Sequence, residues 1–334
     1  MEKNSFNLFC GDNLKILRKF DENSFDSIVT DPPYGISFMK NKWDYDLPPL
    51  KVFKECLRTI KPGGHMLVAC GTKTQHRMAV RIEDAGFEIR DIIAYVYSSG
   101  HPNSKHFDIE LKNQYDEEYI EENYSRLKKY FGYGTRLKPA MELWTLAKKP
   151  CSERTNVANV IKYGTGLLNI QDSKIKGEIE RFPANFIHDG SNEFMDQLED
   201  QSVSRFFYCS KASKNERNKG LNHFSKKEKT GSYEFRINGS LDGKKTLPEA
   251  NNHPTVKPIK LMRYLCKLVT PQNGLILDPY MGSGSTGVAA IIENFNFVGI
   301  EIDKYYCEIA EARIECERNE KLIGETGRLF YENV

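Results

Sequence analysis

Residues 275–292, LILDPYMGSGSTGVAAII, indicate how the chain folds. An apolar run ends in Asp278, a glycine-rich turn follows, and a run of small and apolar residues begins at Ser285 or Thr286. This order is typical of a strand, a tight loop and the first turns of a helix in an α/β sheet. The next apolar run ends in Glu301, 19 residues after Gly282.

The glycine-rich turn has the features of a cofactor loop. Gly282 and Gly284 allow close approach of a ligand, and a helix N-terminus offers free N–H groups. Glu301 follows at the position where an acid binds ribose hydroxyls, so a nucleoside-containing cofactor is expected. The letters also satisfy the dinucleotide pattern G-x-G-x-x-G, and a purely structural turn is a further alternative. Asp278 would repel a pyrophosphate but suits a sulfonium or aminoacyl group, which favours S-adenosylmethionine over NAD.

A second stretch, TDPPYG at residues 30–35, follows the apolar run Ser27-Ile28-Val29. Ligands of open α/β sheets bind at this end of a strand. Pro33 restricts the backbone so that the Pro32 carbonyl and Asp31 present two acceptors, and we expect the ring of Tyr34 to project freely. Two acceptors beside a flat ring suit an exocyclic amino group on an aromatic base. An ordinary Asp-Pro turn is the alternative.

Strand and helix patterns alternate at both ends of the chain and fail in the middle. We expect two α/β blocks that combine into one Rossmann-like, mostly parallel sheet with helices on both faces. The expected strands are 24–30, 65–70, 87–97, 141–149, 274–278 and 297–302, and the expected helices are 49–60, 73–86, 285–294, 305–321 and one beginning after Pro258. The helix 49–60 is expected to stop at KPGG, residues 61–64, and the final helix to carry its charges outward.

Bulk properties exclude several classes of protein. The chain has 334 residues, 39% of them hydrophobic, and no apolar run of eighteen, so a globular cytoplasmic protein without a membrane span is expected. Its eight cysteines show no metal-ligand spacing, so no metal site is expected. The net charge of +2 is segregated: residues 205–245 carry eleven Lys or Arg against four acids, and residues 108–122 carry seven acids against one Lys.

Together these motifs resemble the DNA amino-methyltransferases, and specifically their circularly permuted β group. In that group D-P-P-Y precedes a target-recognition insert and the cofactor loop lies near the C-terminus, as it does here. NNHPTVKP (251–258) resembles the element that leads into the cofactor loop, and GTRLKPAMELWTLAKKP (134–150) the segment that closes the catalytic half. YGTGLLNI (163–170), RFPANFIHDGS (181–191) and RFFYCSKASKNER (205–217) resemble site-specific methyltransferases of phages and prophages.

The resemblance implies a role for each matching residue. Asp31, Pro32, Pro33 and Tyr34 would be catalytic, and Asp31 in place of Ser favours the N6 amino group of adenine over N4 of cytosine. Asp12, in FCGDNL, would contact the cofactor adenine. The other residues implied at the S-adenosylmethionine site, besides Asp31, are His253, Thr255, Lys257, Asp278, Pro279, Tyr280, Gly282, Gly284, Ser285, Thr286 and Glu301. Tyr280 replaces a Phe that is frequent in the family.

The resemblance also implies double-stranded DNA as partner, with the target base flipped out of the duplex. The residues expected to contact DNA are Lys211, Lys214, Arg217, Lys219, Lys226, Lys227 and Lys229. The expected units are 1–150 (catalytic half), 151–250 (target-recognition insert) and 251–334 (cofactor half). A homodimer and a cognate restriction enzyme are further possibilities from the same resemblance. The alternatives are N4-cytosine methylation, methylation of an amino group in RNA or protein, and a DNA-binding protein without activity.

Overall fold

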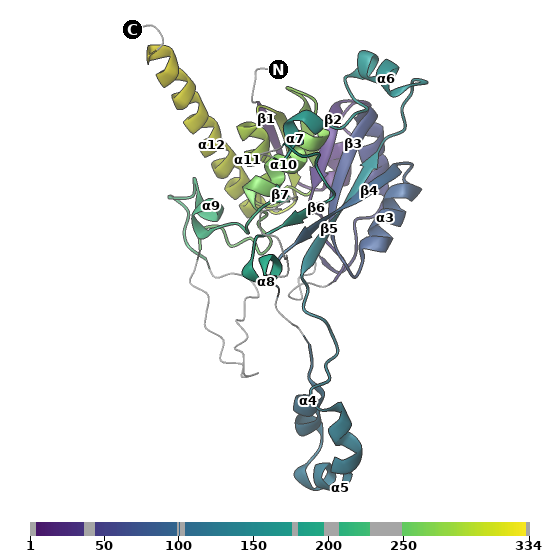
Figure 1. Ribbon diagram of the computed structural model, residues 1–334. Helices are drawn as coiled ribbons and strands as arrows, with labels where there is room; N and C mark the ends of the chain where they lie inside the picture. The colour runs from purple at the N-terminus through teal and green to yellow at the C-terminus, as the bar shows by residue number, and fades with distance from the viewer. Residues whose placement is uncertain are drawn as a thin grey trace.

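The computed structural model describes residues 5–36, 44–98, 100, 104–175, 180–196, 207–227 and 249–331. Within these ranges nine strands form a single sheet in the order β1-β9-β8-β2-β3-β5-β4-β6-β7 (Figure 1). Every neighbouring pair is parallel except those of β5, which is antiparallel to β3 and to β4. The expected mostly parallel α/β sheet is confirmed.

The described strands are β1 Phe6–Cys10, β2 Phe25–Thr30, β3 Ile60–Gly71, β4 Glu88–Val96, β5 Met141–Lys148, β6 Phe186–His188, β7 Phe207–Tyr208, β8 Leu275–Asp278 and β9 Asn296–Glu301. The described helices are α1 Asn13–Leu17, α2 Leu50–Thr59, α3 Gln75–Asp84, α4 Phe107–Gln114, α5 Glu117–Leu127, the 3-10 helix η3 Lys128–Tyr130, α6 Asn156–Tyr163, α7 Ile170–Ser173, α8 Asn192–Met195, α9 Lys214–Asn218, α10 Ile259–Val269, α11 Ser285–Ile292 and α12 Lys304–Tyr331.

Two apolar cores lie on the two faces of the sheet. Strand β2 is buried along its whole length, and because side chains alternate along a strand, Ile28 enters one core and Val29 the other. Helices α1, α2 and α3 cover the core that contains Ile28, and α10, α11 and α12 cover the core that contains Val29. Helices therefore cover both faces, as the alternation of patterns predicts.

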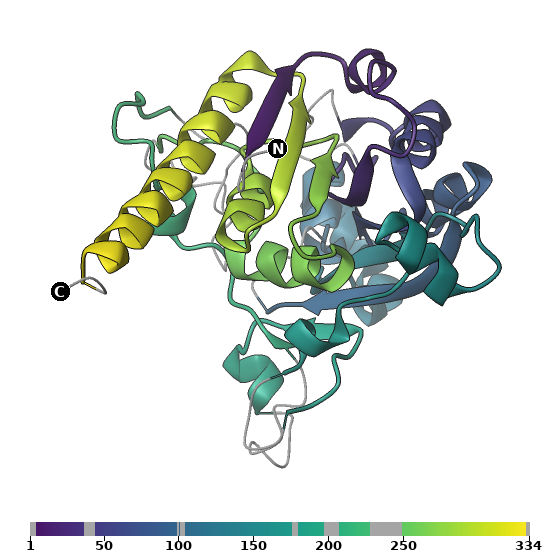
Figure 2. The ribbon, with the colours of Figure 1, turned by 90° about the horizontal axis from the view of Figure 1, so that it is seen from above.

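The two ends of the chain build the middle of the sheet together. Strand β8, from the C-terminal block, pairs with β2, from the N-terminal block, through Ser27–Ile276 and Ile28–Leu277. Strand β1 pairs with β9, and Figure 2 shows the purple N-terminal strand beside its yellow-green partner. The expectation that the two blocks combine into one sheet is confirmed.

The segment KPGG departs from its expected role. Helix α2 does end before it, at Thr59, but β3 begins at Ile60 and continues through these residues. The register jumps here, since Phe25 pairs with Ile60 and Ser27 with His65. The segment is thus an irregularity within a strand, where only a break was expected.

The middle of the chain is more ordered than its sequence pattern suggests. The range 151–250 supplies β6 and β7, which extend the sheet beyond β4, so part of the expected insert belongs to the sheet; its boundaries stay a prediction. Residues 104–140, called the arm below, hold α4, α5 and η3 and stand apart from the sheet (Figure 1).

Two searches of the described residues gave negative results. No helix in these ranges is long and apolar enough to cross a membrane. No group of three or more His, Cys, Asp or Glu side chains in the same ranges is arranged to hold a metal ion.

Candidate active site

The D-P-P-Y loop leaves the carboxyl end of β2 in a conformation fixed by residues outside the motif. The carboxylate of Asp44 accepts bonds from the backbone N–H groups of Tyr34 (2.6 Å), Gly35 (3.0 Å) and Ile36 (3.3 Å). The Thr74 hydroxyl donates to the Tyr34 carbonyl at 2.6 Å. The loop is therefore bound on both sides, which is how a catalytic residue keeps one geometry.

Four side chains meet at the end of β2. The Tyr34 hydroxyl donates to Asp31 Oδ1 at 2.8 Å, and Lys257 Nζ lies 2.7 Å from Asp31 Oδ2. Lys257 Nζ also lies 3.3 Å from Glu142 Oε2 and 3.2 Å from the Tyr34 hydroxyl. The side chain of Lys257 is only 8% exposed, so its ammonium group is buried among these side chains.

The cluster carries a net negative charge in a desolvated place. Burial raises the pKa of Asp31, and the nearby Lys257 ammonium opposes part of that rise. Burial lowers the pKa of Lys257, but the carboxylates of Asp31 and Glu142 outweigh it and the pKa lies above its ordinary value. Burial and the Asp31 carboxylate raise the pKa of Tyr34, so its hydroxyl remains a neutral donor. Two carboxylates against one ammonium favour positive charge that develops nearby.

Tyr34 is not free to project, as its sequence position suggested. Its hydroxyl is held by Asp31 and Lys257, and its ring lies beside Gly71, where an added Cβ would come within 3.2 Å of Tyr34 Cδ2. The ring is half-buried. A base that stacks on Tyr34 and bonds to Asp31 would therefore have to displace the hydroxyl from the carboxylate.

Asp278 connects the glycine-rich loop after β8 with the end of β2. Its Oδ1 accepts from the Thr30 hydroxyl and its Oδ2 from the Thr286 hydroxyl, each at 2.6 Å, and the N–H of Tyr280 donates to Oδ1 at 3.1 Å. Burial raises the pKa of Asp278 to about 7. Both oxygens thus bind protein groups, and Asp278 ties the cofactor loop after β8 to the residue before Asp31.

The glycines of the loop after β8, which the sequence pattern assigns to the cofactor, are required by its backbone and by its packing. Gly282 has φ +54° and Gly284 φ +81°, values that side chains disfavour. A Cβ on Gly282 would lie 2.9 Å from His253 Nε2, and one on Gly284 would lie 2.9 Å from the Ala310 methyl. Close approach here is to the protein itself, whereas the sequence suggested approach to a ligand.

Glu301 and Arg313 hold the same loop from two sides. Glu301 Oε2 accepts from Gly282 N at 2.8 Å, and its Oε1 accepts from Asp303 N at 2.9 Å. Arg313, only 3% exposed, donates to the Ser283 carbonyl at 2.6 Å and lies 3.4 Å from the Ser285 hydroxyl. Burial lowers the pKa of Arg313 to about 10. The expectation that the charges of the last helix point outward is wrong at this residue.

The remaining predicted cofactor residues surround these loops. His253 packs against Tyr306 with ring centroids 4.6 Å apart, and burial lowers its pKa to about 3, so it is neutral. Thr255 is half-buried and its N–H donates to His253 Nδ1 at 3.4 Å. The Pro279 carbonyl accepts from Asn13 at 3.0 Å, and Asp12 is an exposed cap of α1. Lys257, which the resemblance places beside the cofactor, forms an ion pair with Asp31, and its role toward the cofactor stays a prediction.

A positively charged nucleoside fits these surroundings. The loop enters the N-terminus of α11, Glu301 and Asp12 stand at the ends of β9 and β1, and Asp31 adds negative charge at the neighbouring strand. S-adenosylmethionine combines a ribose with a sulfonium, which these groups suit.

The residues expected to contact DNA divide into two groups. Lys211, Lys214, Lys226 and Lys227 are exposed, and Lys211 Nζ lies over the Tyr97 ring at 3.8 Å. Arg217 instead donates to the His253 carbonyl at 2.8 Å and pairs with Glu249. Lys219 pairs with Glu317 and Glu320 of α12 at 2.8 and 2.7 Å. The last of the set, Lys229, lies outside the described residues.

Several residues that complete the site carry no motif in the sequence. Glu142 stands in an ordinary strand pattern, and Asp44 lies in a stretch for which no strand or helix is expected. Arg313 alone had a usable signal, because it shares a helix face with the apolar Ile309 and Ala310. An arginine on an apolar stripe indicates a buried partner.

Comparison with known proteins agrees with this geometry. A family model described as DNA methylase matches residues 25–312. The Type II methyltransferase M.HindIII of Haemophilus influenzae is 22% identical over 93% of this chain and 96% of its own length. M2.DpnII of Streptococcus pneumoniae is 43% identical over 24% of this chain and 29% of its own length. The solved structure of the cytosine-N4-specific PvuII DNA methyltransferase aligns with 92% of this chain and 86% of its own, with TM-score 0.51 and 18% identity, and so shares the fold.

Proposed function

Because the chain belongs to the DNA methylase family, we propose that it transfers a methyl group to the exocyclic N6 amino group of an adenine in double-stranded DNA. It is a DNA methyltransferase of the N6/N4 amino class, and S-adenosylmethionine supplies the methyl group. The choice of adenine is supported by Asp31 at the head of D-P-P-Y, where the resemblance associates Asp with adenine. A cytoplasmic location, a homodimer and a cognate restriction enzyme stay predictions.

One observation carries the proposal: the D-P-P-Y loop and the glycine loop leave adjacent parallel strands, β2 and β8, at the same edge. Thr30 and Asp278 join them by a bond of 2.6 Å, although 248 residues separate them in the chain. An amino group held by Asp31 therefore lies beside the loop proposed to hold the methyl donor. Methyl transfer needs this proximity above all.

The residues at the end of β2 suit attack by an amino nitrogen. That nitrogen is a weak nucleophile because its lone pair is conjugated with the ring. Acceptance of its N–H bonds by Asp31 and the Pro32 carbonyl would favour a tetrahedral nitrogen and stabilise its growing positive charge. As the new N–C bond forms, the methyl–sulfur bond breaks, and the sulfur keeps its electron pair. The nitrogen then loses one proton, for which Asp31, with its raised pKa, is the nearest acceptor.

The test is transfer from labelled S-adenosylmethionine to duplex DNA, followed by digestion to nucleosides and identification of the product. We expect N6-methyladenine from the natural chain and background transfer from Asp31→Asn. Calorimetry with S-adenosylmethionine shows whether Asp31→Asn still binds the donor, and the exposed Asp46→Asn serves as the matched control.

N4-methylcytosine as the product would contradict the choice of adenine but leave the family assignment intact. DNA binding without transfer, or transfer only to RNA or protein, would contradict the proposal as a whole. Sequencing of the modified DNA gives the recognition site in the same experiment.

A further inference from the structure

The arm divides into an acidic half and a basic half. Residues 123–140, called the returning limb, carry five cations and no Asp or Glu, whereas residues 104–122 carry seven acids and two lysines. The cations of the returning limb are all exposed: Arg126, Lys128, Lys129, Arg136 and Lys138. Among the described residues, none of these five lies within ion-pair distance of a carboxylate. Five exposed cations without acid partners suit a polyanion.

The returning limb ends beside the cluster of Asp31, Tyr34, Glu142 and Lys257. The Ala140 carbonyl accepts from the N–H of Tyr97 at 2.9 Å, and Lys211 covers the Tyr97 ring. Two residues further along, Glu142 holds Lys257. Lys138 lies near Lys211: burial is the main cause that lowers the pKa of Lys211, and the positive charge of Lys138 contributes to the same direction. A basic track therefore begins beside Asp31 and continues outward along the limb.

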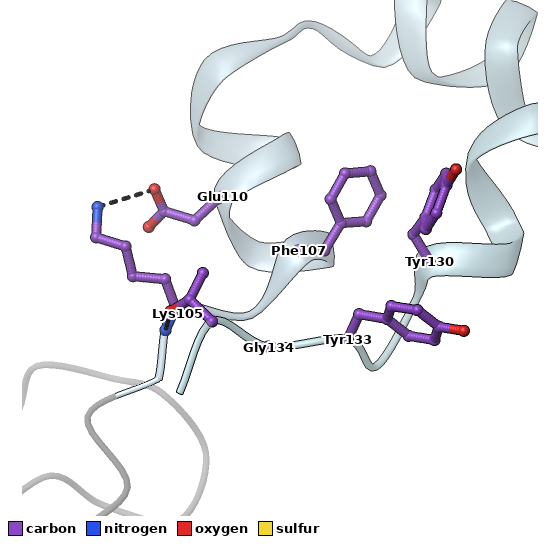
Figure 3. Close-up of a pocket in the computed structure, with 7 residues that line it drawn as sticks. Lys105, Phe107, Glu110, Tyr130, Tyr133 and Gly134 are labelled. Carbon is purple, nitrogen blue, oxygen red and sulfur yellow. Dashed lines mark hydrogen bonds and ion pairs between the residues drawn. The ribbon is translucent and has the colours of Figure 1, made fainter. Parts of the chain in front are cut away.

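The far end of the limb is held in shape by its own aromatic cluster. Phe107 lies 5.6 Å from the Tyr130 ring and 6.3 Å from the Phe131 ring, between centroids. The backbone N–H of Phe107 donates to the Tyr133 carbonyl at 2.9 Å, which joins the two halves of the arm. Tyr130 and Tyr133 line a hollow of about 450 Å³ in this corner (Figure 3). These contacts hold the far end of the limb, where Lys128 and Lys129 lie, in one shape.

We propose that the returning limb lies along the DNA backbone on one side of the target base and that its cations bind the phosphates there. The inference rests on the proposed function, and it assigns a DNA-contacting role to a segment outside the basic range 205–245. The eleven residues from Tyr130 to Ala140, ten Cα–Cα steps, reach at most about 33 Å, and phosphates of one strand follow one another about every 3.4 Å along the helix axis, so this part of the limb covers up to about ten base pairs. The acidic half would be repelled by phosphates and lies off the DNA.

The test compares two triple variants. One replaces Lys128, Lys129 and Arg136 with Gln; the matched control replaces the exposed Lys19, Lys51 and Lys54, which lie outside the arm, with Gln. The probe is a duplex of about 40 base pairs that contains the site mapped by sequencing. Three lost phosphate contacts should make the slope of log K against log salt less negative by about 2 to 3 in the arm variant and leave the control unchanged.

Shortening the duplex adds a second measurement. When one flank of the target is trimmed to a few base pairs, the natural chain should bind about tenfold more weakly, and the arm variant should lose little further affinity. Equal changes of slope in both triples, or an unchanged slope in the arm variant, would overturn the inference. An arm variant that alters self-association in sedimentation while DNA binding stays intact would also overturn it, in favour of a protein contact.

Failure of the proposed function gives a different result. In that case the natural chain methylates no DNA at all, whereas failure of this inference leaves methylation by the natural chain intact and removes only the expected difference between the two triples.

Discussion

The buried carboxyl of Asp278 makes stability depend on pH in a direction that can be worked out. Its folded pKa of about 7 lies above the ordinary value of 3.8, because burial outweighs the hydroxyl bonds from Thr30 and Thr286. Between these two values the folded state binds more protons than the unfolded state, so this group lowers stability as pH rises through the window. About three pKa units correspond to a total of roughly 4 kcal/mol.

The perturbation that isolates this effect is Asp278→Asn. Asparagine does not titrate, so only the natural chain loses stability through this group as the pH rises. The unfolding free energy of the variant minus that of the natural chain should therefore increase with pH, by about 1.4 kcal/mol per pH unit in the range well below pH 7. From pH 5 to pH 7 the increase is about 2.3 kcal/mol, because the slope falls as the pH approaches the folded pKa, and above about pH 8 the difference becomes constant. Lost hydrogen bonds add an offset that does not vary with pH, so the slope is the quantity to compare.

Urea unfolding without cofactor measures this difference, with the fluorescence of the fully buried Trp144 as one signal and circular dichroism as another. Thr286→Val serves as a second variant: it removes a hydroxyl that lowers the Asp278 pKa, so the sloping region should extend to higher pH. A difference between Asp278→Asn and the natural chain that stays flat from pH 5 to pH 8 would refute the reasoning. It would mean that the two hydroxyls stabilise the carboxylate fully.

Three further predictions concern the same loops. Glu142→Gln removes a charge that raises the Asp31 pKa, so the acid limb of the pH–rate profile should move to lower pH. Lys257→Met removes a charge that lowers this pKa, so the acid limb should move to higher pH. Shifts of both variants in the same direction would contradict the proposed coupling. Gly284→Ala should lower the unfolding free energy, measured in urea, by about 2 to 4 kcal/mol, because its methyl group would meet Ala310. The control Gly132→Ala has the same φ of +81° but no atom within 4 Å of its Cβ, so it should lower that free energy by only about 1 to 2 kcal/mol. Equal losses would show that the contact with Ala310 does not contribute. Arg313→Met should weaken S-adenosylmethionine binding about tenfold in calorimetry because the Ser283 carbonyl loses its donor, and an unchanged affinity would show that the loop keeps its shape without it.

The sequence predicts the sheet and its cofactor loop because both depend on local patterns. Buried strand segments such as residues 66–70 of β3 are continuous apolar runs, and a Gly-rich turn before a helix has few structural meanings. The prediction for KPGG was incomplete because a proline and two glycines usually end an element. Here they lie within β3, where the pairing register with β2 jumps. The arm shows the converse, because α5 has no buried residue and therefore leaves no apolar stripe to detect.

The cluster of Asp31, Tyr34, Glu142 and Lys257 is harder to predict, since its members come from distant parts of the chain. Asp31 and Tyr34 share a motif, but Glu142 becomes their neighbour only because β5 pairs antiparallel with β3, next to β2. Arg217 and Lys219 were expected to face DNA, and a charge count alone cannot show that Glu249, Glu317 and Glu320 lie within reach of them. A cluster of basic residues in the sequence identifies a DNA-contacting surface only when it is known which of them pair with acidic residues in the fold.

The resting state of the cluster bears on how a target base would be accepted. Asp31 already accepts from the Tyr34 hydroxyl and from Lys257, so its oxygens are occupied before any base arrives. An amino group that enters must exchange with one of these donors, and the Tyr34 hydroxyl is the one that costs less to release, because it is neutral whereas the ammonium is a buried charge. Release of the hydroxyl also frees the ring to turn toward the base. Binding of the amino group and stacking of the ring would then be one coupled event, with Lys257 and Glu142 holding Asp31 in place throughout.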